Sequence, residues 1–401
     1  MKSIKSICKI VIILSIIFFL NSCEKKNDSN EYKYQYAIPI QTDDGWETES
    51  ASDVGINTND LQEMMQYLHN IEHFIHSILI VKNGKLVFEE YFSGRQFDLT
   101  NNGFALNEGL NYEQLDFDLS TLHYCASASK SITSLLVGIA IDKGYITDTE
   151  DLLFSYFPDY IELENENNSS ITLKNLLSMT AGLTWDDGSY PMYDIRNDEA
   201  NMFTNEDPVE FVLSMPVNYI PGTDFAYHSG LTLLLGEIVH RQSGMLLTEF
   251  AEQFLFGPLD INEYAWAVCE KDESIAFASG GLYLRPRDMA KMGQLLITGG
   301  LWKNEQIVSQ VWINESMAES WHFTPDNHPH PYIMTGYGYQ WWIGQFSTNS
   351  GSVDAIIAAG WGGQFIFVIP ESDMVIVTTA GDYEAENYEL IINSIIGGYL
   401  L

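Results

Sequence analysis

The sequence reads Leu122-His-Tyr-Cys-Ala-Ser127-Ala-Ser-Lys130-Ser-Ile-Thr-Ser-Leu-Leu-Val-Gly-Ile-Ala-Ile-Asp-Lys143 in the stretch around which we expect the chain to be organised. Because Ser127 and Lys130 lie three residues apart, a helix that begins at Ser127 places both side chains on one face. Apolar residues follow at helical spacing, namely Ile132, Leu135, Leu136, Ile139 and Ala140. The stretch therefore predicts a central helix with a hydroxyl and an amine at its start.

This pair has the chemistry of a nucleophile and its base. The positive end of the helix and partial burial both favour a neutral amine, which a serine needs if no histidine activates it. The alternative is that Ser127 is a helix cap and Lys130 a solvated side chain. Other common catalytic motifs are missing from the sequence, including G-x-S-x-G, H-E-x-x-H and a Gly-rich phosphate loop.

Composition limits the class of protein. The chain has 401 residues, of which 46% are hydrophobic and 18% charged, so it can form one large domain or two closely packed ones. The formal net charge is −36, from 19 Lys and Arg against 55 Asp and Glu. Nucleic acid and anionic lipid surfaces are therefore poor partners.

The N-terminus has the pattern of an export signal. Three lysines within the first nine residues precede an apolar run over 10–20, which is too short for a comfortable transmembrane helix. The run ends Leu-Asn-Ser-Cys23, which resembles a bacterial lipoprotein signal. We expect residues 1–22 to be removed, Cys23 to carry lipid, and 23–48 to form a flexible tether. The protein would then be an exported, membrane-anchored lipoprotein on the periplasmic or cell-surface side. An uncleaved anchor or a chance cysteine is the alternative.

Two cysteines remain in the body of the chain, Cys125 and Cys269. Each lies among apolar residues, so we predict buried free thiols, although the sequence does not exclude a disulfide between them. Cys125 would be a candidate nucleophile only if Ser127 were not.

The rest of the pattern predicts an α+β fold for one domain over 49–401. A hairpin with an Asn83-Gly84 turn is expected over 76–92, a loop over 94–120, and mainly helices over about 145–270. Further predicted strands and helices are 277–284, 286–296, 309–319, 355–359, 364–369, 374–379 and 386–400. This order indicates an antiparallel sheet built from both chain ends and flanked by helices, with a helical region inserted.

Two further segments are candidates for the site. Tyr227-His228-Ser229 is predicted to open a helix, and a tyrosine beside a neutral lysine could relay a proton to a leaving group. The alternative is a buried tyrosine with a satisfied hydroxyl, and His228 is a weaker candidate for the base. The run Ala-Ala-Gly360-Trp361-Gly-Gly-Gln is a break at a strand edge, where a backbone N–H could join that of Ser127 in an oxyanion hole. A simple turn is the alternative.

Together and in this order, these motifs resemble the serine β-lactamase and penicillin-binding protein superfamily on its class C side. The resemblance covers roughly 48–401 and includes the ordered landmarks Leu176–Leu183, Phe225–Tyr227, Phe256–Leu259, Ala278–Leu282 and Arg287–Ala290. It implies a β-lactamase/transpeptidase-like fold, with Ser127 as acylated nucleophile, Lys130 as base and Tyr227 as proton-transfer partner. It also implies that the N–H groups of Ser127 and Trp361 hold the oxyanion, and that no metal or cofactor takes part.

Two departures from the β-lactamase pattern narrow the expected substrate. Tyr227-His228-Ser229 stands where β-lactamases usually have Tyr-x-Asn, and Ala-Ala-Gly360 stands where they have Lys-Thr-Gly or His-x-Gly. Because alanine replaces the Lys or His of the second motif, a contact to a substrate carboxylate is lost. The Gly-Trp-Gly-Gly-Gln run is similar to the 6-aminohexanoate-oligomer hydrolase and esterase branch. We therefore expect hydrolysis of a small ester or non-lactam amide, with Ser229, Gly360 and Trp185 contacting the substrate.

Two rival functions stay open at this point. One is a β-lactamase or D-alanyl-D-alanine carboxypeptidase, and the other is a non-catalytic binding protein of the same fold. The sequence leaves the oligomeric state unknown.

Overall fold

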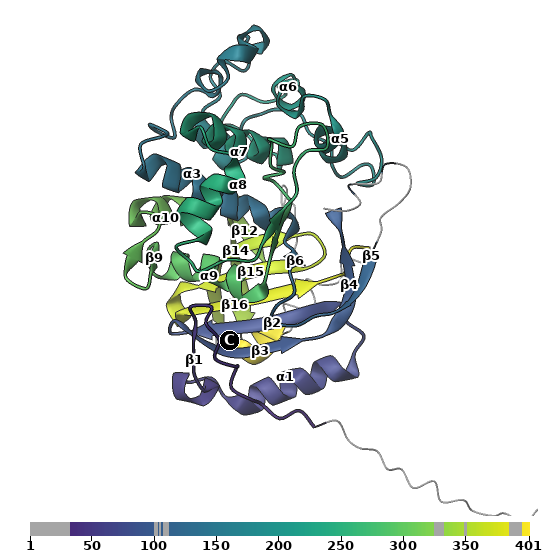
Figure 1. Ribbon diagram of the computed structural model, residues 1–401, viewed down its shortest axis with the longest axis vertical. Helices are drawn as coiled ribbons and strands as arrows, with labels where there is room; N and C mark the ends of the chain where they lie inside the picture. The colour runs from purple at the N-terminus through teal and green to yellow at the C-terminus, as the bar shows by residue number, and fades with distance from the viewer. Residues whose placement is uncertain are drawn as a thin grey trace, which may run out of the picture. The chain divides into compact units, whose positions relative to one another are not determined.

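A large sheet forms the centre of the structure, a computed structural model that describes residues 33–99, 103, 106, 112–324, 333–348, 351–384 and 395–401. The predicted signal peptide and Cys23 lie outside the described residues. Within these ranges the sheet has nine strands in the order β1-β3-β2-β16-β15-β14-β13-β12-β11 (Figure 1). Their bounds are β1 Glu47–Thr48, β2 Ile75–Lys82, β3 Lys85–Tyr91, β11 Trp321–His322, β12 Met334–Tyr337, β13 Trp342–Thr348, β14 Gly351–Gly360, β15 Gln364–Ile369 and β16 Met374–Ala380.

The two ends of the chain meet inside this sheet. Strand β2 pairs antiparallel with β16, so the N-terminal hairpin and the C-terminal strands share one ladder. Only β1, which runs parallel to β3, departs from antiparallel pairing among the described strands. The predicted hairpin is confirmed, with Asn83 and Gly84 both at positive φ in its two-residue turn. The predicted α+β fold with a sheet built from both ends is likewise confirmed.

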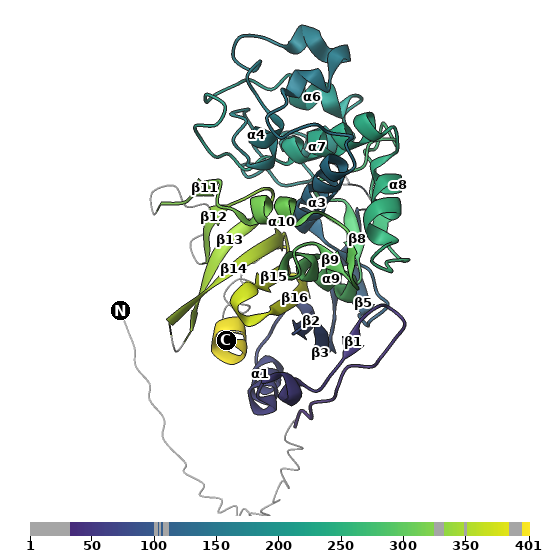
Figure 2. The same cartoon turned by 90° about the vertical axis from the view of Figure 1, so that its left-hand side faces the viewer.

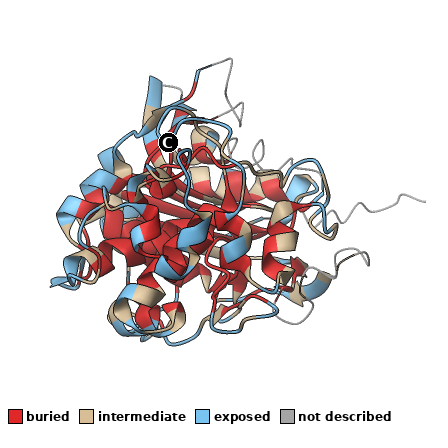
Figure 3. Ribbon diagram, turned by 90° about the horizontal axis from the view of Figure 1, so that it is seen from above, coloured by how far each residue is buried: buried red, intermediate tan, exposed pale blue. Residues whose placement is uncertain are grey.

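Helices cover both faces of the sheet. Helix α1 (Thr58–Asn70) lies on one face, and α9 (Pro286–Ile297) packs against β15 and β16 on the other (Figures 1 and 2). The close packing of α9 depends on Gly293, because a Cβ there would lie 2.6 Å from a Val375 methyl group. The buried residues gather in the central strands and the helices beside them (Figure 3).

The inserted helical region surrounds α3 (Ser129–Asp142), which packs against α7 (Ser229–Ser243). Apolar residues occur all round α3, and every residue from Ser129 to Ala140 is buried, as expected for a helix enclosed by protein. The other helices are α4 Leu173–Leu177, α5 Asp198–Thr204, α6 Pro208–Leu213, α8 Leu247–Ala251 and α10 Gln310–Met317. Short 3-10 or π segments are η1 Ala51–Val54, η2 Ala126–Ala128, η3 Leu153–Ser155, η4 Pro158–Leu163, η5 Glu252–Phe256, η6 Pro370–Ser372 and η7 Ile396–Leu400.

Three small sheets complete the fold. They pair β4 (Ser93–Phe97) with β5 (Tyr112–Asp116), β9 (Leu301–Trp302) with β10 (Glu305–Gln306), and β6 (His123–Tyr124) with β8 (Leu282–Leu284) and β7 (Ala265–Trp266). The β6–β8 pair matters for the site, because Cys125 and the η2 turn follow β6 directly. The backbone N–H of Cys125 continues this pairing by donating to the Leu282 carbonyl.

Several local predictions were wrong. The predicted loop over 94–120 contains the β4–β5 pair, and the predicted strand 277–284 is extended only at its end, because Phe277 to Gly281 form a tight turn. Helix α5 was missed: it is short and polar, with Asn197 as its cap. Most of the predicted helix 386–400 lies outside the described residues.

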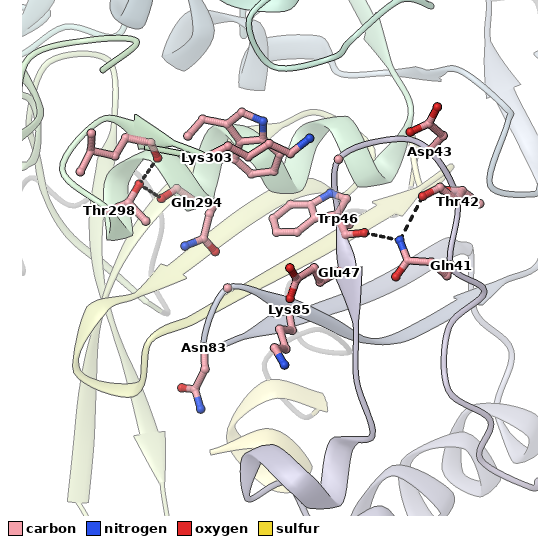
Figure 4. A pocket seen from close by; sticks show the side chains of 14 residues that line it. Gln41, Thr42, Asp43, Trp46, Glu47, Asn83, Lys85, Gln294, Thr298 and Lys303 are labelled. Atoms are coloured by element: carbon pink, nitrogen blue, oxygen red, sulfur yellow. Dashed lines mark hydrogen bonds between the residues drawn. The ribbon is translucent and has the colours of Figure 1, made fainter. Parts of the chain in front are cut away.

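The predicted tether 23–48 ends earlier than expected. From Tyr34 onward the chain belongs to the folded unit that extends to Leu401. Trp46 is 2% exposed, and its indole Nε1 donates a hydrogen bond of 2.9 Å to the Arg287 carbonyl. This buried indole, with its N–H satisfied, holds the segment on the domain (Figure 4). The polar composition of the segment had predicted a tether instead.

Both cysteines of the described chain are buried free thiols, as predicted. Burial raises the pKa of Cys125 and of Cys269 to about 12, so neither is a ready nucleophile. In the part of the chain that the structure describes, every helix is too short or too polar to traverse a bilayer.

Candidate active site

Lys130 is buried and points at Ser127. Its Nζ donates hydrogen bonds to Ser127 Oγ at 3.0 Å and to the Ser279 carbonyl at 2.9 Å, and its side chain is 1% exposed. The alternative of a solvated lysine is therefore wrong. Because the Ser279 carbonyl comes from a segment 149 residues away, tertiary structure orients the amine toward the hydroxyl.

Ser127 itself lies in the 3-10 turn η2 rather than in the first turn of α3. Ala126, which precedes it, has φ 47°, a left-handed conformation that costs a residue with a side chain roughly 1–2 kcal/mol. The turn thereby lifts Ser127 out of the helix, and its side chain is half-buried while its neighbours are fully buried. Backbone strain of this kind persists where surrounding structure enforces it.

Strand β14 ends against this turn at Gly360. A Cβ on Gly360 would lie 2.2 Å from the Cys125 carbonyl oxygen and 3.1 Å from the Ala128 nitrogen, so only glycine fits there. The residue after it, Trp361, lines the same cleft as Ser127. Gly360 therefore allows the backbone of β14 to approach the turn that carries Ser127. That the N–H groups of Ser127 and Trp361 together bind an oxyanion stays a prediction.

Tyr227 lies beside the lysine, and its role in proton transfer stays a prediction. Lys130 Nζ is 4.9 Å from the centroid of its ring, and the ring stacks on Trp342 with centroids 5.5 Å apart. His228 occupies a different position: its buried ring stacks on Trp185 at 4.1 Å. Burial lowers the pKa of His228 to about 3, so it is a neutral packing residue and not the base.

The two remaining predicted substrate contacts, Ser229 and Trp185, differ in exposure: Ser229 is buried and Trp185 is partly exposed. Ser229 is buried at the start of α7, and Trp185 donates from its indole Nε1 to Asp187 Oδ2 at 3.0 Å. Asp187 lines the cleft, whereas Trp185, Ser229 and Gly360 are absent from its lining. Their contact with substrate stays a prediction.

The cleft beside Ser127 has a volume of about 600 Å³. Three carboxylic acids line it, Asp187, Glu199 and Glu384, and the described lining contains no lysine or arginine. Four tyrosines, Trp361 and a few small or apolar residues form the rest of the wall: Tyr112, Tyr190, Tyr193, Tyr383, Gly188, Pro191 and Met192. This wall suits an uncharged or cationic molecule with apolar parts.

Glu199 is the residue that sequence reasoning missed. It is 9% exposed on α5, and its Oε1 lies 3.6 Å from where a Cβ of Gly280 would be. Burial raises the pKa of its carboxyl, and the charge of Lys130 opposes that rise. Acidic residues are common in the first turn of a helix, where they interact favourably with the helix dipole. The sequence position of Glu199 therefore gave no sign of a role at the site.

Within the described residues, no group of three or more His, Cys, Asp or Glu side chains is arranged to hold a metal ion. The groups gathered here are instead a hydroxyl, an amine and a phenol. That set performs nucleophilic acyl transfer.

Comparison with known proteins agrees with this geometry. The family model for Beta-lactamase matches residues 69–390. This chain belongs to that family. Its fold is the β-lactamase/transpeptidase-like fold that the sequence predicted.

Proteins named as esterases and amide hydrolases are among the relatives. The chain is 26% identical over 276 residues to a 6-aminohexanoate-dimer hydrolase of Paenarthrobacter ureafaciens, a match that covers 66% of this chain and 68% of the relative. It is 28% identical over 205 residues to a lovastatin esterase of Penicillium rubens, covering 48% of this chain and 50% of that enzyme. A family VIII carboxylesterase has the same fold, with a TM-score of 0.62, 17% identity, and coverage of 84% of this chain and 96% of that one.

Proposed function

We propose that this family member is a serine hydrolase that works through an acyl-enzyme on Ser127. The observation that carries the proposal is the buried Lys130 Nζ held 3.0 Å from Ser127 Oγ by the Ser279 carbonyl. An amine in this position accepts the hydroxyl proton as the oxygen attacks.

The steps balance with the residues present. Neutral Lys130 takes the proton of Ser127 while Oγ forms a bond to the substrate carbonyl carbon. The N–H groups of Ser127 and Trp361 stabilise the resulting oxyanion. As the intermediate collapses, Tyr227 passes a proton to the departing alcohol or amine and recovers one from Lys130. Water then attacks the acyl-enzyme by the same path and restores the free serine.

The substrate class follows from the cleft. The three acids of the cleft and the alanines of β14 provide no cation for a substrate carboxylate, which a penicillin carries. Tyrosine rings and a tryptophan instead match the apolar parts of an ester or linear amide. The printed names of two relatives, a 6-aminohexanoate-dimer hydrolase and a lovastatin esterase, support the same two classes.

A fluorophosphonate probe tests the nucleophile. Wild type should be labelled and Ser127→Ala should not, because only an activated hydroxyl attacks the phosphorus of the probe and displaces its fluoride. If the wild type also resists labelling, a non-catalytic binding protein replaces the enzyme as the better function.

Replacing the base tests the mechanism. Lys130→Ala should reduce kcat for a p-nitrophenyl ester by about 10²–10⁴-fold, the usual contribution of a positioned base. Lys143→Ala, at the exposed end of the same helix, is the matched control and should leave kcat unchanged. Near-normal turnover by Lys130→Ala would remove the lysine from the mechanism.

A substrate panel separates the rival enzymes. Simple esters and linear amides should be hydrolysed faster than a chromogenic cephalosporin. Cephalosporin turnover at a rate that matches the esters would favour the β-lactamase or D-alanyl-D-alanine carboxypeptidase function instead.

We also propose that the protein is an exported lipoprotein anchored through Cys23. The support is the positive N-terminus, the apolar run and the Leu-Asn-Ser-Cys sequence. Metabolic labelling with a radioactive fatty acid should mark the wild type but not Cys23→Ala. Equal labelling of both proteins, or of neither, would contradict the anchor.

A further inference from the structure

Glu199 lines the active-site cleft but has no role in the acyl transfer described so far. Its side chain is nearly buried, and its Oε1 is 3.6 Å from the position that a Cβ of Gly280 would occupy. The carboxyl therefore lies against the turn over 277–281, which also supplies the Ser279 carbonyl that accepts a hydrogen bond from Lys130. A buried acid is costly unless hydrogen bonds or an opposite charge compensate it, so its partners indicate what it does.

Two buried hydroxyls face this carboxyl. Burial raises the pKa of Glu199, and the charge of Lys130 and the hydroxyls of Ser229 and Ser279 oppose that rise, so all three groups favour the carboxylate. Both hydroxyls are buried, and no other described group accepts a hydrogen bond from them. Because buried hydroxyls normally have an acceptor, the Glu199 carboxylate is the group that satisfies both. Ser279 thus faces the acid with its hydroxyl and the lysine with its carbonyl.

Helix α5 holds the acid firmly against this turn. The cap residue Asn197 accepts a hydrogen bond of 3.0 Å from the backbone N–H of Glu199. Further along the helix, the ring of Phe203 packs edge to face on Phe277, with ring centroids 5.0 Å apart. Phe277 opens the turn that orients the lysine, so the acid and the turn are packed together as one unit.

Other ionisable groups surround this cluster. Asp187 faces Glu199 from the segment before α5 and adds to the rise in its pKa, because neighbouring carboxylates repel each other. Tyr124 from β6 and His228 before α7 stay neutral, since burial raises the pKa of the phenol well above 10 and lowers that of the imidazole to about 3. The ring of Tyr227 lies 4.9 Å from the lysine Nζ. Glu199 and Asp187 are therefore the acids whose charges act on the lysine.

We propose that Glu199 is a positioning residue that acts through Lys130, an inference that rests on the proposed function. Its carboxylate fixes the hydroxyl of Ser279 and thereby the carbonyl that aims the amine at Ser127. When Lys130 takes the proton of Ser127 it becomes a buried ammonium, and the preorganised carboxylate stabilises that charge as it forms. The acid of a serine–histidine–acid triad acts on its imidazolium in the same way.

The pH dependence of kcat/KM separates this role from a purely structural one. Glu199→Gln keeps the size of the side chain and one acceptor oxygen but removes the charge. Because the carboxylate favours the ammonium, its removal should free the amine at lower pH. The acidic limb of kcat/KM for a p-nitrophenyl ester should therefore move down by about one pH unit. In addition, kcat on the plateau should fall about tenfold or more with little change in KM, because the stabilised charge exists only in the transition state.

Two matched variants complete the experiment. Glu199→Asp disturbs the packing but retains the charge, so its acidic limb should stay near that of wild type. Glu210→Gln removes an exposed acid from the first turn of α6, outside the cleft, and should change neither the limb nor kcat.

The outcomes distinguish this inference from the proposed function. If wild type hydrolyses the ester and the acidic limb of Glu199→Gln does not move, the inference fails and the proposed function stands. Equal movement of the limb in the Gln and Asp variants would assign the effect to packing and would also refute the inference. A wild type that neither hydrolyses the ester nor reacts with the fluorophosphonate refutes the proposed function, and the inference fails with it.

Discussion

Gly360→Ala tests how the sheet positions the nucleophile. The new Cβ would lie 2.2 Å from the Cys125 carbonyl oxygen, whereas ordinary van der Waals contact begins near 3.4 Å. The end of β14 and the η2 turn must therefore separate by about 1 Å. This movement carries Trp361 away from Ser127, because both residues adjoin the contact.

The expected effect is on the chemical step. A displacement of about 1 Å in a catalytic group costs roughly 10²-fold in rate, close to the loss of one oxyanion donor. We therefore expect kcat for a p-nitrophenyl ester to fall about 100-fold with little change in KM. Overpacking should also lower the free energy of unfolding by about 1–3 kcal/mol, visible as a modest fall in Tm.

Gly398→Ala is the control for this substitution, since an added Cβ there meets no atom within 4 Å. It should leave both kcat and Tm near their wild-type values. If Gly360→Ala turned over the ester within about twofold of wild type, the close approach of β14 would not position the site.

Three further predictions concern stability. Arg287→Ala should lower the free energy of unfolding by about 3–5 kcal/mol in urea titrations, because this 2% exposed guanidinium neutralises two carboxylates; a loss under about 1 kcal/mol would refute a structural role. Burial lowers the pKa of His76 to about 3 and that of His123 well below 6.5. The unfolded chain therefore binds more protons, so stability should fall as pH drops from about 6.5 toward 3, and His123→Phe should flatten that slope. Gly138→Ala puts a Cβ 2.2 Å from the Trp312 ring, so Tm should fall while kcat of the folded fraction stays unchanged.

Much of the local structure follows from the order of the residues. The Asn83-Gly84 turn and its flanking strands were predictable, because the turn needs positive φ at both positions. The helix after Ser127 was predictable from its apolar spacing. The Ser-x-x-Lys spacing likewise predicted that hydroxyl and amine lie within reach of each other, although Ser127 lies in the 3-10 turn before α3 rather than in the helix itself.

Other predictions failed where distant contacts decide the conformation. The segment before β1 has a linker's composition, yet one indole that finds the Arg287 carbonyl holds it on the domain. Helix α5 is too short for its periodicity to be seen, so Glu199 was not recognised as a neighbour of Lys130. The predicted contact of Trp185 with substrate stays a prediction; its indole N–H donates to Asp187, which lines the cleft.

The sequence alone determined which chemical groups this protein can use. The three-residue spacing of Ser127 and Lys130 brings hydroxyl and amine together through local backbone geometry. Only the tertiary structure decided how those groups are arranged. The carbonyl of Ser279 aims the Lys130 amine, and Gly360 lets a strand from the far end of the chain meet the Ser127 turn. Such contacts join residues more than a hundred positions apart, and their geometry depends on packing of the whole domain rather than on any local pattern.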